Sequence, residues 1–275
     1  MTFYLHEVAP RQGIAWTREG FRAFFKRPMA LASLFISFMF VGVLAMALPA
    51  GGLLLVLALP LLSLGYMIAT RSVLTGGPVH PGQLIEPLRA PAGQPDAQRR
   101  RKTLLMLCAL YALVTLLIIW LSNSIDGGRF DRLQELMAGG QGTDSANEAE
   151  VQQLLADPSL INGLLVRFGL AALLAIPFWH APALVWWGGQ GLAQALFSST
   201  LAVWRTKGAF FMYGVAWALV VGAFGIITAT VFSLIGARQL VGVAAMPAAL
   251  MFTVAFYVSL YFSFVDTFGQ PEPSA

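Results

Sequence analysis

Residues 164–187 read LLVRFGLAALLAIPFWHAPALVWW, an almost wholly apolar stretch. A helix of this length spans about 36 Å, against about 30 Å for the hydrocarbon core of a bilayer. Pro177 and Pro182 interrupt the stretch, because each proline removes a helical N–H donor and clashes with the preceding turn. The sequence therefore predicts a membrane-spanning helix that is broken between residues 177 and 182.

The break is the main candidate for a cavity or a packing site. Freed backbone groups at membrane depth are tolerated where they face a water-filled cavity or are buried in protein. An ionisable side chain at that depth is a functional candidate. Alternatively, His180 is a neutral packing residue that donates a hydrogen bond to a freed backbone carbonyl, and the tryptophans of this stretch gather at the membrane interface. The candidate residues are Pro177, Trp179, His180, Pro182, Trp186 and Trp187.

Five further apolar stretches are long enough to cross a membrane. Only 11% of the 275 residues are charged and 57% are apolar, whereas about 25% of a soluble domain is charged. The sequence therefore predicts an all-α fold, a polytopic helical membrane protein with six transmembrane helices in one membrane domain over residues 1–275. The predicted spans are residues 29–48, 53–70, 103–122, 164–187, 209–235 and 241–264.

Two amphipathic stretches approach the membrane spans. In residues 10–27 the cations share one helical stripe, and Ile14, Phe21, Phe24 and Phe25 share the neighbouring stripe. Such helices lie in the headgroup layer with their rings toward the hydrocarbon. Residues 190–206 form a second amphipathic stretch. The cations predicted to contact anionic lipid headgroups are Arg18, Arg22, Lys26, Arg27, Arg99, Arg100, Arg101 and Lys102, although the last four can also simply fix topology.

The distribution of cations predicts the orientation in the membrane. With both termini in the cytoplasm, 13 of the 17 Lys and Arg residues fall in cytoplasmic segments, as the positive-inside rule requires. Residues 71–102 are then a cytoplasmic basic loop. Residues 123–163 are a periplasmic acidic segment, and their pattern predicts a small cap of two short helices. The predicted location is the inner membrane of a bacterium.

Motifs for catalysis are missing from the sequence. We find no GxxxxGK[ST], HExxH, CxxC or GxSxG, and His6, His80 and His180 share no metal-ligand spacing. The six predicted spans contain no Asp or Glu. We therefore expect no catalytic residues, metal or cofactor. The expected partners are membrane lipids and an unidentified membrane protein, and not nucleic acid.

These observations favour a non-enzymatic scaffold or assembly partner in envelope or lipid-related processes. The alternative is a transporter or lipid-handling protein with a cavity at the Pro177–Pro182 break. A membrane-embedded enzyme is a third class, which the sequence supports least because no paired acid and base can be named.

Two motifs carry a resemblance to a known group. GIAWTREGFRAFFKRP (13–28) and PFWHAPALVWWGGQGLAQALFSS (177–199) resemble betaproteobacterial inner-membrane proteins of unassigned activity. More distantly, interfacial helices that lead into hairpins are similar to the membrane domain that accompanies some glycerophosphodiester phosphodiesterases. The resemblance implies an inner-membrane location and carries over no catalytic residue.

Overall fold

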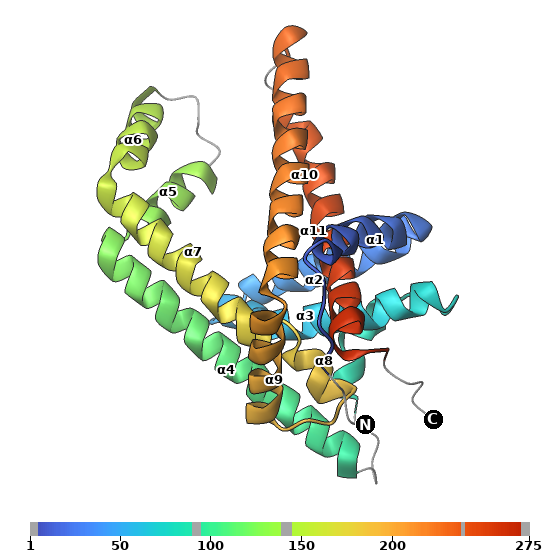
Figure 1. Ribbon diagram of the computed structural model, residues 1–275. Helices are drawn as coiled ribbons and strands as arrows, with labels where there is room; N and C mark the ends of the chain where they lie inside the picture. Colours follow the sequence, from blue (N-terminus) through green and yellow to red (C-terminus); the bar gives the residue numbers. More distant parts are fainter. Residues whose placement is uncertain (1–4, 90–94, 139–144, 238–239, 271–275) are drawn as a thin grey trace. The chain divides into compact units, whose positions relative to one another are not determined.

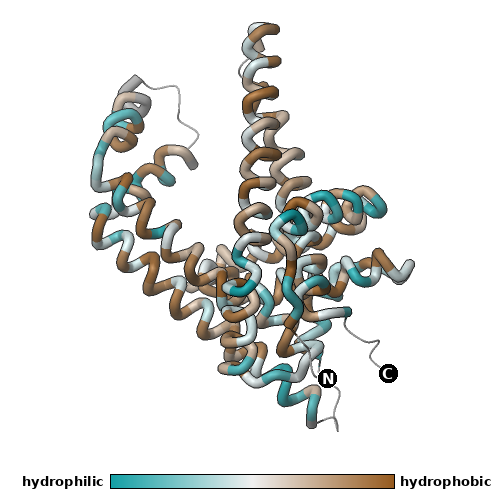
Figure 2. The backbone as a smooth tube through the Cα atoms, viewed as in Figure 1, coloured by the Kyte–Doolittle hydropathy of each residue, from teal (hydrophilic) through white to brown (hydrophobic). Residues whose placement is uncertain are grey.

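The computed structural model describes residues 5–89, 95–138, 145–237 and 240–270, and every regular element in these ranges is helical. The side chains of residues 95, 138 and 145–148 also lie outside the described set. Six helical stretches are long and apolar enough to cross a membrane, which confirms the predicted all-α, polytopic fold. They are Pro28–Met46, Gly51–Leu74, Asp96–Asp126, Pro158–Trp186, Lys207–Leu234 and Val241–Phe268. Figure 2 shows hydrophobic colouring along much of their length.

Two 3-10 turns, η1 and η2, lie between α3 and α4 along the chain (Figure 1). The chain divides into two compact units, Met1–Cys108 with Pro177–Ala275, and Ala109–Ile176. We call them the first and the second unit. The helix bounds are α1 Gln12–Lys26, α2 Pro28–Met46, α3 Gly51–Leu74, α4 Pro95–Asp126, α5 Arg129–Ala138, α6 Ser145–Ala156, α7 Pro158–Phe178, α8 Ala181–Trp186, α9 Leu192–Arg205, α10 Lys207–Leu234 and α11 Val241–Phe268, with 3-10 turns η1 Pro81–Leu84 and η2 Glu86–Leu88.

In the first unit, α1 packs against α10 and α11 (Figure 1). Small residues make the close approach possible, as in other helix pairs within membranes. A Cβ atom at Gly13 would lie 1.9 Å from the backbone oxygen of Ala209, and one at Gly20 would lie 2.6 Å from Cβ of Ser259. Trp16 is buried between these glycines and packs edge-on against Phe210 on α10.

The buried face of α1 takes in part of the stripe that we predicted to face the hydrocarbon. Ile14 and Phe25 are 53% and 62% exposed, as a lipid-facing stripe requires, but Phe24 is buried and Phe21 is half-buried against other helices. Lipid tails solvate large apolar side chains, whereas the closest contacts between helices are made by small residues. The buried face of α1 combines small residues with two large rings: Gly13, Trp16, Thr17, Gly20, Ala23 and Phe24.

Helix α9 shows the same division. Its buried residues are Ala195, Ser199 and Ala202, which recur every three or four positions and share one face. Phe197 and Trp204 of the same helix are both largely exposed. Helix α9 therefore packs through small residues and turns two large rings outward, whereas α1 buries Trp16 and Phe24 along with its small residues.

Part of the predicted loop over residues 71–102 is helical. Helix α4 begins at Pro95, so the four cations at 99–102 lie on its first turns rather than in a loop. Before it, η1 and η2 fold back onto α3. Gly65 of α3 leaves room for this segment, because a Cβ atom there would lie 2.7 Å from the side chain of Leu84. The amide of Gln83 donates to Ser72 Oγ at 3.0 Å.

The second unit contains the distal part of α4, with α5, α6 and most of α7. Helices α5 and α6 occupy the places of the two short helices predicted within residues 123–163. They pack against each other, and Arg132 of α5 forms an ion pair with Glu150 of α6 at 2.9 Å. Leu133 of α5 and Leu160 of α7 are buried.

Candidate functional site

The predicted break lies between α7 and α8. Helix α7 ends at Phe178 and α8 begins at Ala181, so Trp179 and His180 form the link. Pro182 lies in the first turn of α8, where a missing N–H costs nothing. The backbone N–H of His180 donates to Ser199 Oγ on α9 at 3.0 Å. The break is therefore stabilised by a hydroxyl from a helix later in the chain.

The imidazole of His180 is completely buried. Three aromatic rings surround it edge-on, with centroid distances of 6.0 Å to Phe210, 5.8 Å to Phe264 and 5.4 Å to Phe268. Neither ring nitrogen has a hydrogen-bond partner among the described residues. The predicted hydrogen bond from this ring to a freed carbonyl is therefore not formed, and the ring has no access to water in this structure.

Trp179 belongs to an aromatic cluster inside the first unit. Its ring lies edge-on to Phe210 and Tyr213 of α10, at 5.3 and 5.9 Å, and its Nε1 donates to Ser263 Oγ of α11 at 3.3 Å. Trp187 packs against Phe264 at 5.2 Å. Pro182 is buried, and Pro177, Trp186 and Trp187 are half-buried. The structure thus brings most of the candidate break residues into one packed region.

Three of the cations predicted to contact lipid headgroups donate hydrogen bonds to backbone carbonyls. Arg100 Nη1 donates to the carbonyl of Trp186 at 3.1 Å, and Arg99 Nη2 donates to that of Gly189 at 3.0 Å. These bonds satisfy carbonyls at and beyond the C-terminus of α8, which lack helical partners. Arg27 Nη1 donates to the carbonyl of Gly77 at 2.6 Å. Arg101 and Lys102 are exposed.

The exposed face of α1 carries the other headgroup candidates. Arg22 pairs with Glu19 at 2.7 Å, and Arg18 approaches the same carboxylate at 3.5 Å. Lys26 is exposed beside Phe25. This cationic face with apolar side chains beside it has the composition of a helix that lies at a charged lipid surface.

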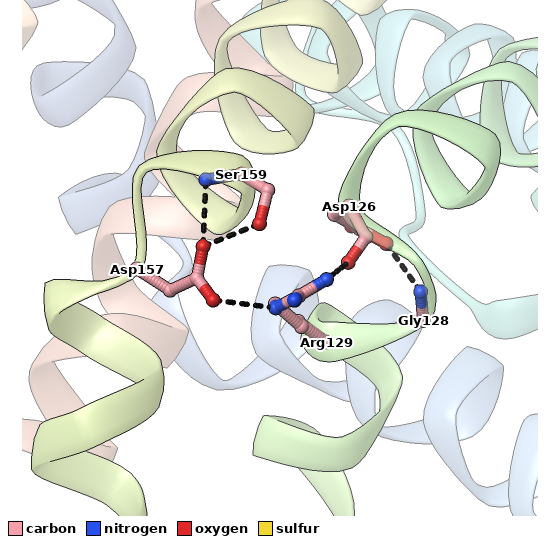
Figure 3. Close-up of polar contacts among 5 residues, drawn as sticks. All are labelled: Asp126, Gly128, Arg129, Asp157 and Ser159. Atoms are coloured by element: carbon pink, nitrogen blue, oxygen red, sulfur yellow. Dashed lines mark hydrogen bonds and ion pairs between the residues drawn. The ribbon is translucent and has the colours of Figure 1, made fainter.

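A second polar cluster lies in the second unit, where α4, α5 and α7 begin or end (Figure 3). Arg129 donates through Nε to Asp157 Oδ2 and through Nη1 to the backbone oxygen of Asp126, both at 2.7 Å. The hydroxyl and backbone N–H of Ser159 donate to Asp157 Oδ1. The Ser159 hydrogen bonds lower the pKa of Asp157, and Arg129 lowers it further.

Asp126 is completely buried in this cluster. Its Oδ1 accepts from the N–H of Gly128 at 2.8 Å, and its Oδ2 has no hydrogen-bond partner among the described residues. It fits against α7 because Gly163 has no side chain, since a Cβ atom there would lie 2.6 Å from Cβ of Asp126.

One turn further along α7, Arg167 bonds across to α4. Its Nε donates to Ser122 Oγ at 2.9 Å, and Nη2 donates to Asn123 Oδ1. Its guanidinium lies 4.1 Å from the ring centroid of Phe130, a cation–π contact. Our sequence analysis did not identify this interhelical layer. The spacing of four residues between Ser122 and Asp126, and between Gly163 and Arg167, is the signal that could have revealed it.

Six candidate spans, basic interfacial helices and a broken fourth span define a multi-pass helical membrane protein. In comparisons with known proteins, the chain is 32% identical over 274 residues to a "Probable inner membrane protein" of Burkholderia thailandensis, covering 98% of this chain and 96% of the relative. The chain belongs to the family of that inner-membrane protein. No family model matches the chain, and no solved structure is significantly similar to it.

Proposed function

We propose that this inner-membrane protein is a non-catalytic scaffold or assembly partner in envelope or lipid-related processes. The observation that carries the proposal is the two-sided character of α1. One face is fixed to α10 and α11 through Gly13 and Gly20, and the other presents Arg18, Arg22 and Lys26. A helix held in this way offers a rigid cationic surface to anionic headgroups or to a partner.

The orientation with both termini in the cytoplasm is part of the same proposal. The cytoplasmic leaflet is the anionic one, and each Lys or Arg near it gains about 1 kcal/mol. The 13 cations of the segments assigned to this side, α1 included, support the assignment.

The plan of the interfacial helices supports a common design with the membrane domains of glycerophosphodiester phosphodiesterases. A single residue outside helical geometry, Arg27 or Thr206, separates each amphipathic helix from the span that follows it. We include this kinship in the proposal at the level of layout only.

The transporter or lipid-handling alternative requires a water-filled cavity at the break. In this structure His180, Ala181, Pro182 and Ala183 are buried, so such a cavity would demand a rearrangement of α8. The scaffold therefore fits the observed packing better.

Mild extraction of the tagged protein, followed by mass spectrometry of co-purifying proteins and lipids, tests the proposal. We expect a stoichiometric membrane-protein partner, and we expect the double reversal Arg18→Glu with Arg22→Glu to release it. The matched control reverses two exposed arginines outside α1, Arg89→Glu with Arg205→Glu, and should retain the partner. A defined small molecule without any protein partner, unaffected by the α1 reversal, would favour the cavity instead.

A further inference from the structure

The second unit contains an apolar groove between α4 and α7. Its volume is about 390 Å³, and valine, isoleucine and leucine side chains of both helices line it, among them Ile118, Leu121, Leu170 and Leu173. Both helices belong to candidate membrane spans, so this groove opens where hydrocarbon chains are the surrounding solvent. A groove of this lining fits a lipid acyl chain.

A cation lies directly beyond one end of the groove. Arg167 precedes Leu170 by three residues, and its partner Ser122 follows Ile118 by four, so both lie about one helical turn from the groove lining. Nε and Nη2 of Arg167 are held by Ser122 and Asn123, whereas its Nη1 makes no hydrogen bond or ion pair with any described residue. The guanidinium is thus oriented and still has donors for an anion, and its fork geometry suits phosphate.

A carboxylate near Arg167 selects the kind of headgroup. Asp131 is exposed and accepts from Asn123 Nδ2 at 2.9 Å, while Oδ1 of the same Asn123 amide accepts from Arg167. A headgroup with only negative charge would be repelled by this carboxylate. In a headgroup that carries an ammonium beside its phosphate, the phosphate would meet Arg167 and the ammonium would meet Asp131.

We propose that the groove, Arg167 and Asp131 form a binding site for one phospholipid with a primary ammonium headgroup. An acyl chain occupies the groove, the phosphate accepts from Nη1 of Arg167, and the ammonium faces Asp131. This site lies in the second unit, so it does not rest on the proposed scaffold role of α1.

The test uses the full-length protein in vesicles of phosphatidylethanolamine and phosphatidylglycerol, followed by extraction and native mass spectrometry of retained lipid. We expect one phosphatidylethanolamine per chain, retained in preference to phosphatidylglycerol. Arg167→Gln should lower its occupancy about tenfold or more, because a charge-assisted hydrogen bond is lost. Asp131→Asn should reduce the preference for phosphatidylethanolamine over phosphatidylglycerol.

A pair of tryptophan variants on α7 tests the groove itself. Leu173 is 61% exposed and lines the groove, whereas Leu165 is 67% exposed and does not. Leu173→Trp should fill the groove and displace the lipid, and Leu165→Trp should leave it bound. Arg167→Lys covers the case in which Arg167→Gln fails to fold. Equal retention of both lipids by the wild type would overturn the proposal, as would retention unchanged by Leu173→Trp.

Discussion

The indole Nε1 of Trp16 donates a hydrogen bond of 2.8 Å to Asp266 Oδ2, joining α1 to the last turns of α11. The amide of Gln12 donates to the same oxygen at 2.7 Å. No basic residue among those described forms an ion pair with this carboxylate. Two neutral donors from α1 therefore bind a charged acceptor on a helix that lies 250 positions away in the chain.

Replacing Asp266 by alanine should detach α1. Two hydrogen bonds to a charged group are lost, so we expect the free energy of unfolding to fall by about 2 kcal/mol. Chemical unfolding in detergent, followed by tryptophan fluorescence, measures the change. Glu19→Ala is the control, because Glu19 makes only surface pairs with Arg18 and Arg22 and should cost less than about 1 kcal/mol. Equal losses for the two variants would contradict a special role for Asp266.

Gly13→Ala should be the most damaging glycine substitution on α1. The new methyl group would meet the backbone of Ala209 and Tyr213, which cannot yield as a flexible side chain can, so we expect a loss of about 1–3 kcal/mol. Gly214→Ala on α10 is matched in chemistry but points into open space. It should be neutral or should stabilise the helix by up to about 1 kcal/mol. Thermal unfolding of both variants in detergent compares them.

Substitutions at Arg100 and Arg101 should have different effects, the first on stability and the second on lipid binding. Arg100→Gln removes the bond to the Trp186 carbonyl and should lower the free energy of unfolding by about 1–2 kcal/mol. Arg101 is exposed, so Arg101→Gln should leave stability unchanged and should weaken binding to phosphatidylglycerol vesicles. Unfolding and vesicle co-sedimentation of the two variants provide the measurements. If Arg101→Gln lowered the free energy of unfolding more than Arg100→Gln, then Arg100 would not stabilise the end of α8.

His180→Phe should keep the fold intact. The ring nitrogens of His180 have no hydrogen-bond partners among the described residues, and three phenylalanines surround the ring. The substitution replaces the two ring nitrogens by carbon and so removes buried polar atoms. The free energy of unfolding should therefore stay the same or rise by about 1 kcal/mol. If the variant is fully folded but no longer supports the function of the protein in cells, the imidazole is functional rather than structural.

A cysteine at position 180 tests its access to water. Cys108→Ala gives a background without other thiols. Because position 180 is completely buried, we expect a water-soluble maleimide to leave His180→Cys unlabelled until the protein is unfolded. Rapid labelling of the folded protein would support the alternative hypothesis of a water-filled cavity at the break.

Acid should loosen the start of α7 through Asp157. The folded pKa of this carboxyl lies below its ordinary value of 3.8, so its contribution to stability is complete above about pH 5 and is lost as the pH falls through the folded pKa. Ser159→Ala removes the hydroxyl hydrogen bond and should move this loss to higher pH. Hydrogen exchange of residues 157–165 between pH 2 and pH 6 measures it. Glu135→Gln, an exposed residue of another ion pair, should leave the profile unchanged.

Much of the fold could be predicted from the sequence, because spans and breaks are local properties. The apolar runs predict six spans, and Pro177 and Pro182 bracket the link between α7 and α8. The buried face of α1 could not be found by its rings. Phe25 and Trp16 are both large aromatic residues, but Trp16 lies between Gly13 and Gly20, where the absence of side chains lets other helices approach closely.

The candidate sites were harder to predict, because they depend on distant partners. The surroundings of His180 come from Phe210, Phe264 and Phe268, on helices that begin 27 or more residues later. The layer of Asp126 and Arg167 requires the register between α4 and α7. Antiparallel pairing places Asp126 against Gly163 and Ser122 against Arg167, which becomes clear only once the two helices are known to be neighbours.

The docking of α1 onto Asp266 also sets an order of events during synthesis. A ribosome makes the N-terminal segments first, so α1 emerges long before its acceptor on α11 exists. The newly made helix has no backbone of Ala209 to bind until α10 has been made, and no carboxylate of Asp266 until the final span, α11, has followed. The first helix to be translated is therefore among the last to reach its place, and a chain truncated before α11 would leave it loose on the membrane surface.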